Sequence, residues 1–97
     1  KEFEKIIKLT KNLAKENNSK LYFVYLPDYK SLEKINKNYQ LIKNIIFKLE
    51  IPFIDIRKEF LENKQHYLKY FPYELPGHYN IEGYKVVAET IYKYTNN

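Results

Sequence analysis

The stretch KLYFVYL, residues 20–26, decides the fold class of this chain. It is a nearly continuous run of aromatic and aliphatic residues, which is typical of a strand covered on both faces in a parallel sheet. Pro27 and Asp28 end the run. A second apolar run, residues 51–56, predicts another strand. Pro52 is compatible with this strand, because it lies near the start, where a missing amide donor is tolerated. The sequence therefore predicts two strands.

Amphipathic segments surround both predicted strands. Apolar residues recur at helical spacing over residues 2–17, 32–49 and 81–94, and a shorter helix is predicted over residues 57–62. This alternation predicts an α/β fold, a three-layer αβα domain with a parallel, flavodoxin-like sheet. Two strands make a small sheet. We therefore expect residues 1–97 to be a single domain or the C-terminal part of a larger one, with further strands supplied upstream or by a partner copy.

Polar residues are predicted to mark the ends of these helices. The first helix should end at Asn17-Asn18-Ser19, which tolerate turn conformations. Ser31 is the predicted N-cap of the second helix, and Asn80 is that of the last. Behind Asn80, the last helix carries an apolar stripe made of Tyr84, Val87, Ala88, Ile91 and Tyr94.

Composition excludes several classes of site. The chain has no cysteine, and His66 and His78 are twelve residues apart without a carboxylate cluster, so we predict no metal and no cofactor. The net charge is +5, but the lysines are scattered over polar helix faces among glutamates, which predicts a solvated surface and no nucleic-acid partner. No apolar run reaches the length of a membrane span. Composition indicates neither a membrane association nor a cellular compartment.

Residues 63–79 show no clear period, and a loop of this length in a small domain is often functional. Its last part, followed by the final helix, reads FPYELPGHYNIEGY over residues 71–84. Pro72, Pro76 and Gly77 disfavour regular structure there. The loop is therefore predicted to hold His78 just before the N-terminus of the last helix.

This block resembles the C-terminal block of the SGNH (GDSL-like) hydrolases. In that family a histidine, an asparagine two residues later and a glycine five residues later precede a final helix, as do His78, Asn80 and Gly83 here. The resemblance covers about the last 25 residues. It implies that His78 is the general base of a serine esterase. The family's aspartate three residues before the histidine is replaced by Leu75, so the nearest acid on the loop, Glu74, is the expected orienting group.

The resemblance also implies that the nucleophilic serine lies upstream of Lys1. Ser19 and Ser31 look like turn and cap residues, and neither lies in a glycine-bearing strand-to-helix turn. The absence of an initiator methionine fits a fragment, which alone should be inactive. We therefore expect part of an esterase, O-acyl hydrolase or acyltransferase whose substrate is a small-molecule or glycan ester.

Other residues could share this site or serve structure alone. Ligands bind beyond the carboxyl ends of parallel strands, where Asp28, Asp55 and Arg57 should lie with His78. Asp55 is expected mainly to accept hydrogen bonds from backbone amides. Tyr73 and Tyr79 either line a substrate pocket or pack the loop onto the body.

Two alternatives to catalysis remain open. His78 could instead donate to a backbone carbonyl and stabilise its turn, and the replacement of the family's aspartate by Leu75 is consistent with a non-catalytic scaffold. Such a scaffold would bind a glycan or a protein partner through the aromatic loop. Nucleic-acid binding through the lysine-rich helices is the remaining alternative, and it requires an affinity that falls steeply with salt.

Overall fold

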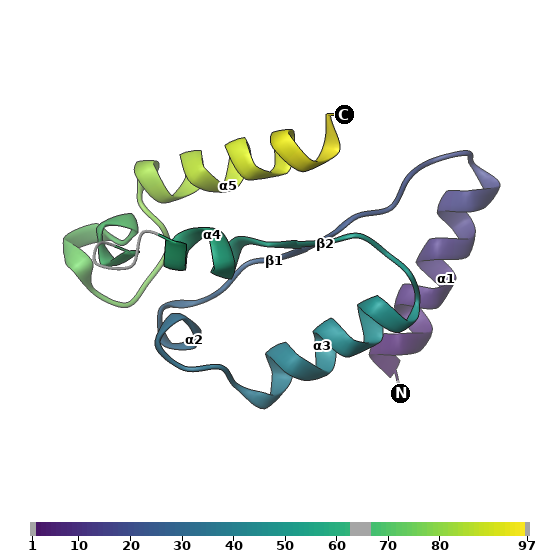
Figure 1. Ribbon diagram of the computed structural model, residues 1–97, viewed down its shortest axis with the longest axis horizontal. Coiled ribbons are helices and arrows are strands. Elements are labelled where there is room, and N and C mark those ends of the chain that lie inside the picture. Colours follow the sequence, from purple (N-terminus) through teal and green to yellow (C-terminus); the bar gives the residue numbers. More distant parts are fainter. Residues whose placement is uncertain (1, 63–66, 97) are drawn as a thin grey trace. The chain divides into compact units, whose positions relative to one another are not determined.

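The computed structural model describes residues 2–62 and 67–96 (Figure 1). It is a mixed α/β structure, mostly helical, in which β1 (Phe23–Tyr25) and β2 (Phe53–Asp55) pair as a small parallel sheet. The α/β class predicted from the sequence is thus confirmed. Within the described ranges these are the only strands, so the three-layer arrangement stays a prediction.

The helices follow the predicted order, with one correction. Their bounds are α1 Glu2–Glu16, α2 Tyr29–Glu33, α3 Lys37–Lys48, α4 Ile56–Glu62 and α5 Ile81–Thr95, with 3-10 turns η1 Tyr67–Tyr70 and η2 Pro72–Glu74 between α4 and α5. The single helix expected over residues 32–49 is wrong. The chain forms two helices there, because Lys34 is extended and ends α2.

The predicted burial of the first strand is also wrong. β1 has three residues, each only partly buried, and Leu26 is 54% exposed. A strand covered on both faces needs layers above and below it. The apolar run predicted the strand correctly, but it did not determine how much of the strand is covered.

The chain forms two compact units. The first contains Lys1–Phe23 and Lys37–Phe53, and the second contains Val24–Asn36 and Ile54–Asn97. Their boundary falls within both strands. Each unit has its own cluster of aromatic side chains.

In the first unit, α1 and α3 are joined through lysine side chains. The ammonium group of Lys11 donates to the carbonyl of Leu49 at the end of α3. Lys48 pairs with Glu4 at 2.9 Å, and this ammonium group lowers the pKa of the Glu4 carboxyl. A positive charge at the end of α3 also complements the partial negative charge of the helix carbonyls. Phe53 lies at the centre of this unit's aromatic cluster, stacked on Phe23 with ring centroids 5.9 Å apart.

Both helices of this unit end in the same way. Asn18 and Glu50 have left-handed backbones, with φ of 54° and 58°. The next residue in each case donates back to a carbonyl of the last turn, Ser19 to Ala14 at 2.8 Å and Ile51 to Ile46 at 3.1 Å. This is the Schellman arrangement, which satisfies carbonyls that the helix leaves unpaired. The turn expected after α1 is therefore confirmed.

The second unit is built where the N-terminus of α5 contacts η1. The backbone amide of Asn80 donates to the carbonyl of Tyr70 at 2.7 Å, and its side-chain amide donates to the carbonyl of Lys69 at 2.6 Å. Its side-chain oxygen accepts from the amide of Gly83 at 2.9 Å, which confirms Asn80 as the N-cap. A Cβ atom on Gly83 would lie 2.8 Å from the Tyr70 carbonyl oxygen. Only glycine allows this approach without displacing backbone.

The buried face of α5 differs in part from the predicted stripe. Gly83 and Thr90 are buried, whereas Tyr84 is 53% and Tyr94 is 45% exposed. α5 runs alongside α4, whose Phe60 is fully buried (Figure 1). Gly83 faces inward because the absence of a side chain permits the contact with Tyr70 of η1.

No helix in the described part of the chain is long and apolar enough to cross a membrane.

We predict that Gly83→Ala destabilises the chain by about 1–3 kcal/mol in urea unfolding, because the added methyl group overlaps the Tyr70 carbonyl. In an ordinary helix the same change stabilises by up to about 1 kcal/mol, so the sign of the effect is diagnostic. Lys85→Ala, an exposed change on α5, is the control and should have little effect. A stabilised Gly83→Ala variant would contradict the packing described for α5.

Glu50→Gly is expected to stabilise the chain by about 0.5–1 kcal/mol, because glycine adopts the left-handed backbone at the end of α3 without steric cost. Thermal unfolding measures the effect. Glu50→Ala removes the same side chain but keeps the steric cost, so it should show no such gain. Equal gains from both variants would assign the effect to the carboxylate instead.

Candidate functional site

The loop between η2 and α5 carries His78, the residue that the sequence analysis singled out as a candidate base. His78 is exposed and follows Gly77, whose φ of +153° is readily adopted only by glycine. Two residues later, Asn80 caps α5 and is bonded to η1. His78 is therefore held between a glycine turn and a fixed helix N-terminus.

Tyr79 anchors this loop to the end of β1. Its hydroxyl donates to the carbonyl of Pro27, and its ring lies 5.1 Å from that of Phe60 and 5.5 Å from that of Phe71, centroid to centroid. Burial raises the pKa of the Tyr79 hydroxyl, which keeps it protonated as a donor. Tyr79 thus ties His78 to the carboxyl end of a strand.

A pocket of about 230 Å³ opens at this place. It is lined by Leu26, Pro27, Asp28, Gly77, His78, Tyr79 and Tyr84. The carboxyl end of a parallel strand is the usual position of a ligand site in α/β proteins. The structure therefore brings His78 and Asp28 together, as expected from the topology.

Asp28 has a structural task that corrects the prediction for Ser31. Asp28, not Ser31, is the N-cap of α2, and its Oδ1 atom accepts from the amide of Ser31 at 2.7 Å. The Ser31 hydroxyl accepts from the Asp28 amide at 3.0 Å, which completes a capping box. Ser31 is buried, and its hydroxyl is engaged at the start of the helix. The sequence feature that indicates this cap is Asp28 directly after Pro27, because aspartate is a preferred N-cap residue.

Tyr73 and Glu74 are exposed residues of η2, just before this loop. Both have left-handed backbones, with φ of 55° for Tyr73 and 57° for Glu74, and the Tyr73 side chain is 92% exposed. The hydroxyl of Tyr29 donates to the carbonyl of Glu74 at 3.2 Å. Among the described residues, no hydrogen bond joins the Glu74 carboxylate to His78.

The other charged residues expected at this edge, Asp55 and Arg57, form hydrogen bonds with backbone groups. Asp55 Oδ1 accepts from the amide of Lys58 at 3.2 Å, which confirms its predicted use as an acceptor. Arg57 Nε donates to the carbonyl of Ser31 at 2.7 Å, and its guanidinium also donates to that of Leu32 at 3.4 Å. Arg57 thus binds the carbonyl end of α2, a role that its position in the sequence did not indicate.

Within residues 2–62 and 67–96, no group of three or more His, Asp or Glu side chains is placed to hold a metal ion. His66, the other histidine, lies outside the described residues.

Comparison with known proteins finds no matching family, no matching curated protein and no matching solved structure.

We expect Tyr79→Phe to lower the free energy of unfolding of the chain. In this variant, the free energy of unfolding should also decline less steeply as the pH rises into the alkaline range. Below the ordinary tyrosine pKa of 10.0, both folded and unfolded chains carry a neutral phenol. Above it, the unfolded chain loses this proton first because the folded pKa is raised, so the stability contributed by Tyr79 declines with rising pH. Urea unfolding across this range measures the difference. Tyr92→Phe, at an exposed position of α5, is the control, and identical pH profiles for Tyr79→Phe and the unaltered chain would contradict the burial effect.

Proposed function

We propose that this chain supplies the histidine part of an SGNH-type acyl-transfer site that acts on ester bonds. The observation that carries the proposal is the pocket at the carboxyl end of β1, which both His78 and Asp28 line. Acyl transfer by a serine needs a base with a pKa near neutrality, and histidine is that residue. An exposed imidazole at a pocket is accessible to both a hydroxyl group and a substrate.

The nucleophile is proposed to come from outside these 97 residues. The hydroxyl of Ser31 is engaged in the capping box of α2. Ser19 belongs to the first unit, where its hydroxyl donates to the carbonyl of Asn17 at 3.3 Å. A further segment or a partner copy would supply the serine, and it would also extend the two-stranded sheet towards a three-layer αβα domain.

Asp28 is the acid best supported as the group that orients His78, with Glu74 as the alternative. Asp28 lines the pocket with His78, and its cap hydrogen bond uses Oδ1, which leaves Oδ2 for a second partner. A carboxylate bonded to the imidazole fixes its tautomer and stabilises the cation formed during transfer. Glu74 is closer to His78 in sequence, but it is not among the residues that line the pocket.

The test is made on the protein purified from its natural source. We expect labelling by a fluorophosphonate, which reacts with activated serines, and turnover of short-chain 4-nitrophenyl esters. His78→Ala should lower kcat/KM by about a thousandfold through loss of the general base. Full turnover without this imidazole, or the absence of both labelling and turnover, would refute the proposal.

A matched pair of isosteric variants distinguishes the two acids. Asp28→Asn keeps the Oδ1 acceptor for Ser31 but removes the charge, and it should lower kcat by at least ~100-fold. Glu74→Gln should leave kcat nearly unchanged. The reverse result would assign the orienting role to Glu74.

A second candidate function is a binding scaffold that recognises a glycan through its loop. It is favoured by Tyr73, which is 92% exposed on a turn closed by hydrogen bonds from Glu74 to Phe71 at 2.9 Å and from Leu75 to Pro72 at 3.1 Å. A preformed aromatic surface costs little entropy on binding. Glycan-array binding lost in Tyr73→Ala, but retained in His78→Ala and in the exposed control Tyr92→Ala, would support this function over catalysis.

A further inference from the structure

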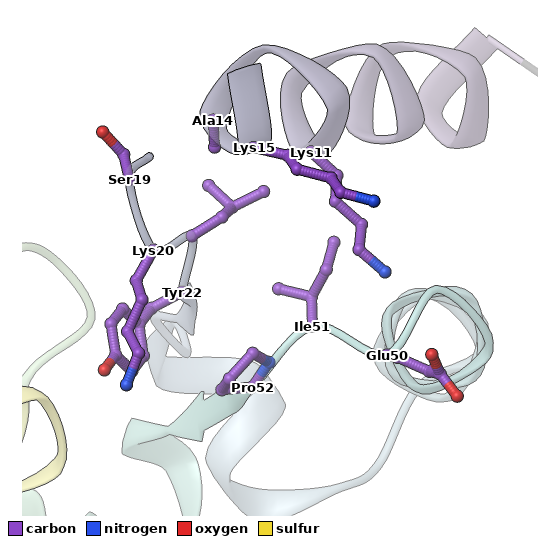
Figure 2. Close-up of a pocket in the computed structure, with 10 residues that line it drawn as sticks. Lys11, Ala14, Lys15, Ser19, Lys20, Tyr22, Glu50, Ile51 and Pro52 are labelled. Carbon is purple, nitrogen blue, oxygen red and sulfur yellow. The ribbon is translucent and has the colours of Figure 1, made fainter. Parts of the chain in front are cut away.

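The first unit contains a cavity that the proposed esterase site does not use. It has a volume of about 320 Å³ and lies between the end of α1, the segment leading into β1 and the segment after α3 (Figure 2). Sites for small molecules usually measure roughly 300–1,000 Å³. Its lining is mostly apolar, and we call the part formed by Ala14, Leu21, Ile51 and Pro52 its apolar base. This cavity is therefore large enough for a small ligand with an apolar body.

The walls of the cavity are fixed by hydrogen bonds. Ser19 and Ile51, one on each side, donate to the last turns of α1 and α3 at 2.8 and 3.1 Å. Lys11 joins the two walls through its bond to the carbonyl of Leu49. Because these carbonyls are already bonded, the negative ends of the two helices are largely compensated. The cavity is preformed, so little ordering is needed when a ligand binds.

Positive charge surrounds the apolar base. The lining contains three lysines, Lys11, Lys15 and Lys20, and one acid, Glu50. The charged side chains of the lining therefore carry a net positive charge. Figure 2 shows Lys11 and Lys15 extending together from α1, with Lys20 and Tyr22 on the opposite side. Within the described part of the chain, neither Lys15 nor Lys20 forms an ion pair. Two adjacent ammonium groups above an apolar base are complementary to an anion that carries an apolar group.

We propose that this cavity binds a small organic anion, a carboxylate or phosphate attached to an aromatic or branched aliphatic group. The apolar body contacts Ile51, Leu21 and Pro52, and the anionic group lies against Lys15 beside Lys11. Tyr22 offers a hydroxyl at the far end. The site belongs to the first unit alone and is independent of the function proposed for His78.

Isothermal titration calorimetry of the whole chain tests the proposal with 1-naphthyl phosphate and 1-naphthoate as probes. The unaltered chain should bind both anions more tightly than 1-naphthol, which lacks the charge, and more tightly than inorganic phosphate, which lacks the apolar body. Affinity for the anions should fall as the salt concentration rises. If only one of the two anions binds, the result supports the proposed site and restricts its ligand to a carboxylate or to a phosphate.

Charge variants locate the site. Lys15→Gln should weaken binding of 1-naphthyl phosphate by about tenfold, whereas Lys8→Gln, the same change at an exposed position of α1 outside the cavity, should leave it nearly unaltered. Glu50→Gln removes the only acid of the lining and should strengthen binding several-fold. These changes lie at exposed positions, and circular dichroism checks that each variant folds.

Three results would overturn the proposal. The first is no heat of binding for either anion at millimolar concentration. The second is equal affinity for 1-naphthol, which would show an apolar cavity without charge recognition. The third is an equal loss in Lys8→Gln and Lys15→Gln, which would show that the net charge of the chain attracts the probe without a defined site.

Discussion

The contact between the N-terminus of α5 and η1 supports the whole of the second unit. The carbonyl of Tyr70 accepts from Asn80, and it leaves no room for a Cβ atom at Gly83. A hydrogen bond at 2.7 Å and a glycine in the first turn of the helix together fix where α5 begins. Since His78 and Tyr79 immediately precede this point, their positions depend on the same contact. The aromatic cluster around Phe60 lies in the same unit, and α4, which carries Phe60, packs against α5.

The loop before α5 combines local strain with tertiary anchors. Successive left-handed residues such as Tyr73 and Glu74 cost on the order of 1 kcal/mol or more each, and they persist only when the surroundings hold them. Here Tyr29 binds the Glu74 carbonyl and Tyr79 binds that of Pro27. Strain of this kind is common at functional sites. It keeps Tyr73 exposed and His78 at the pocket, an arrangement that suits either catalysis or recognition.

The two units use their charged residues differently. In the second unit, Arg57 binds two carbonyls at the end of α2, and Asp28 accepts from the Ser31 amide at its start. In the first unit, Lys11 and Lys48 join α1 to α3, while Lys15 and Lys20 remain at the cavity. The positively charged residues of the chain therefore do more than form a solvated surface. Some of them stabilise helix ends, and others surround an apolar cavity.

The sequence by itself determined the features that depend on local chemistry. Apolar periodicity predicted β1, β2 and most helices, and the preference of asparagine for caps predicted Asn80. It did not determine the break after α2 or the cap at Asp28, because cap choice depends on which side chain reaches an amide in three dimensions. Nor could it show the limited burial of β1 or the burial of Gly83 on α5, since both depend on contacts between distant segments. The topology led us to expect His78 near Asp28, but whether the loop folds back over that edge was decided by tertiary structure. The two residues are 50 positions apart in the chain, and the hydrogen bonds of Tyr79 to Pro27 and of Tyr29 to Glu74 hold the loop there, so that both residues line one pocket.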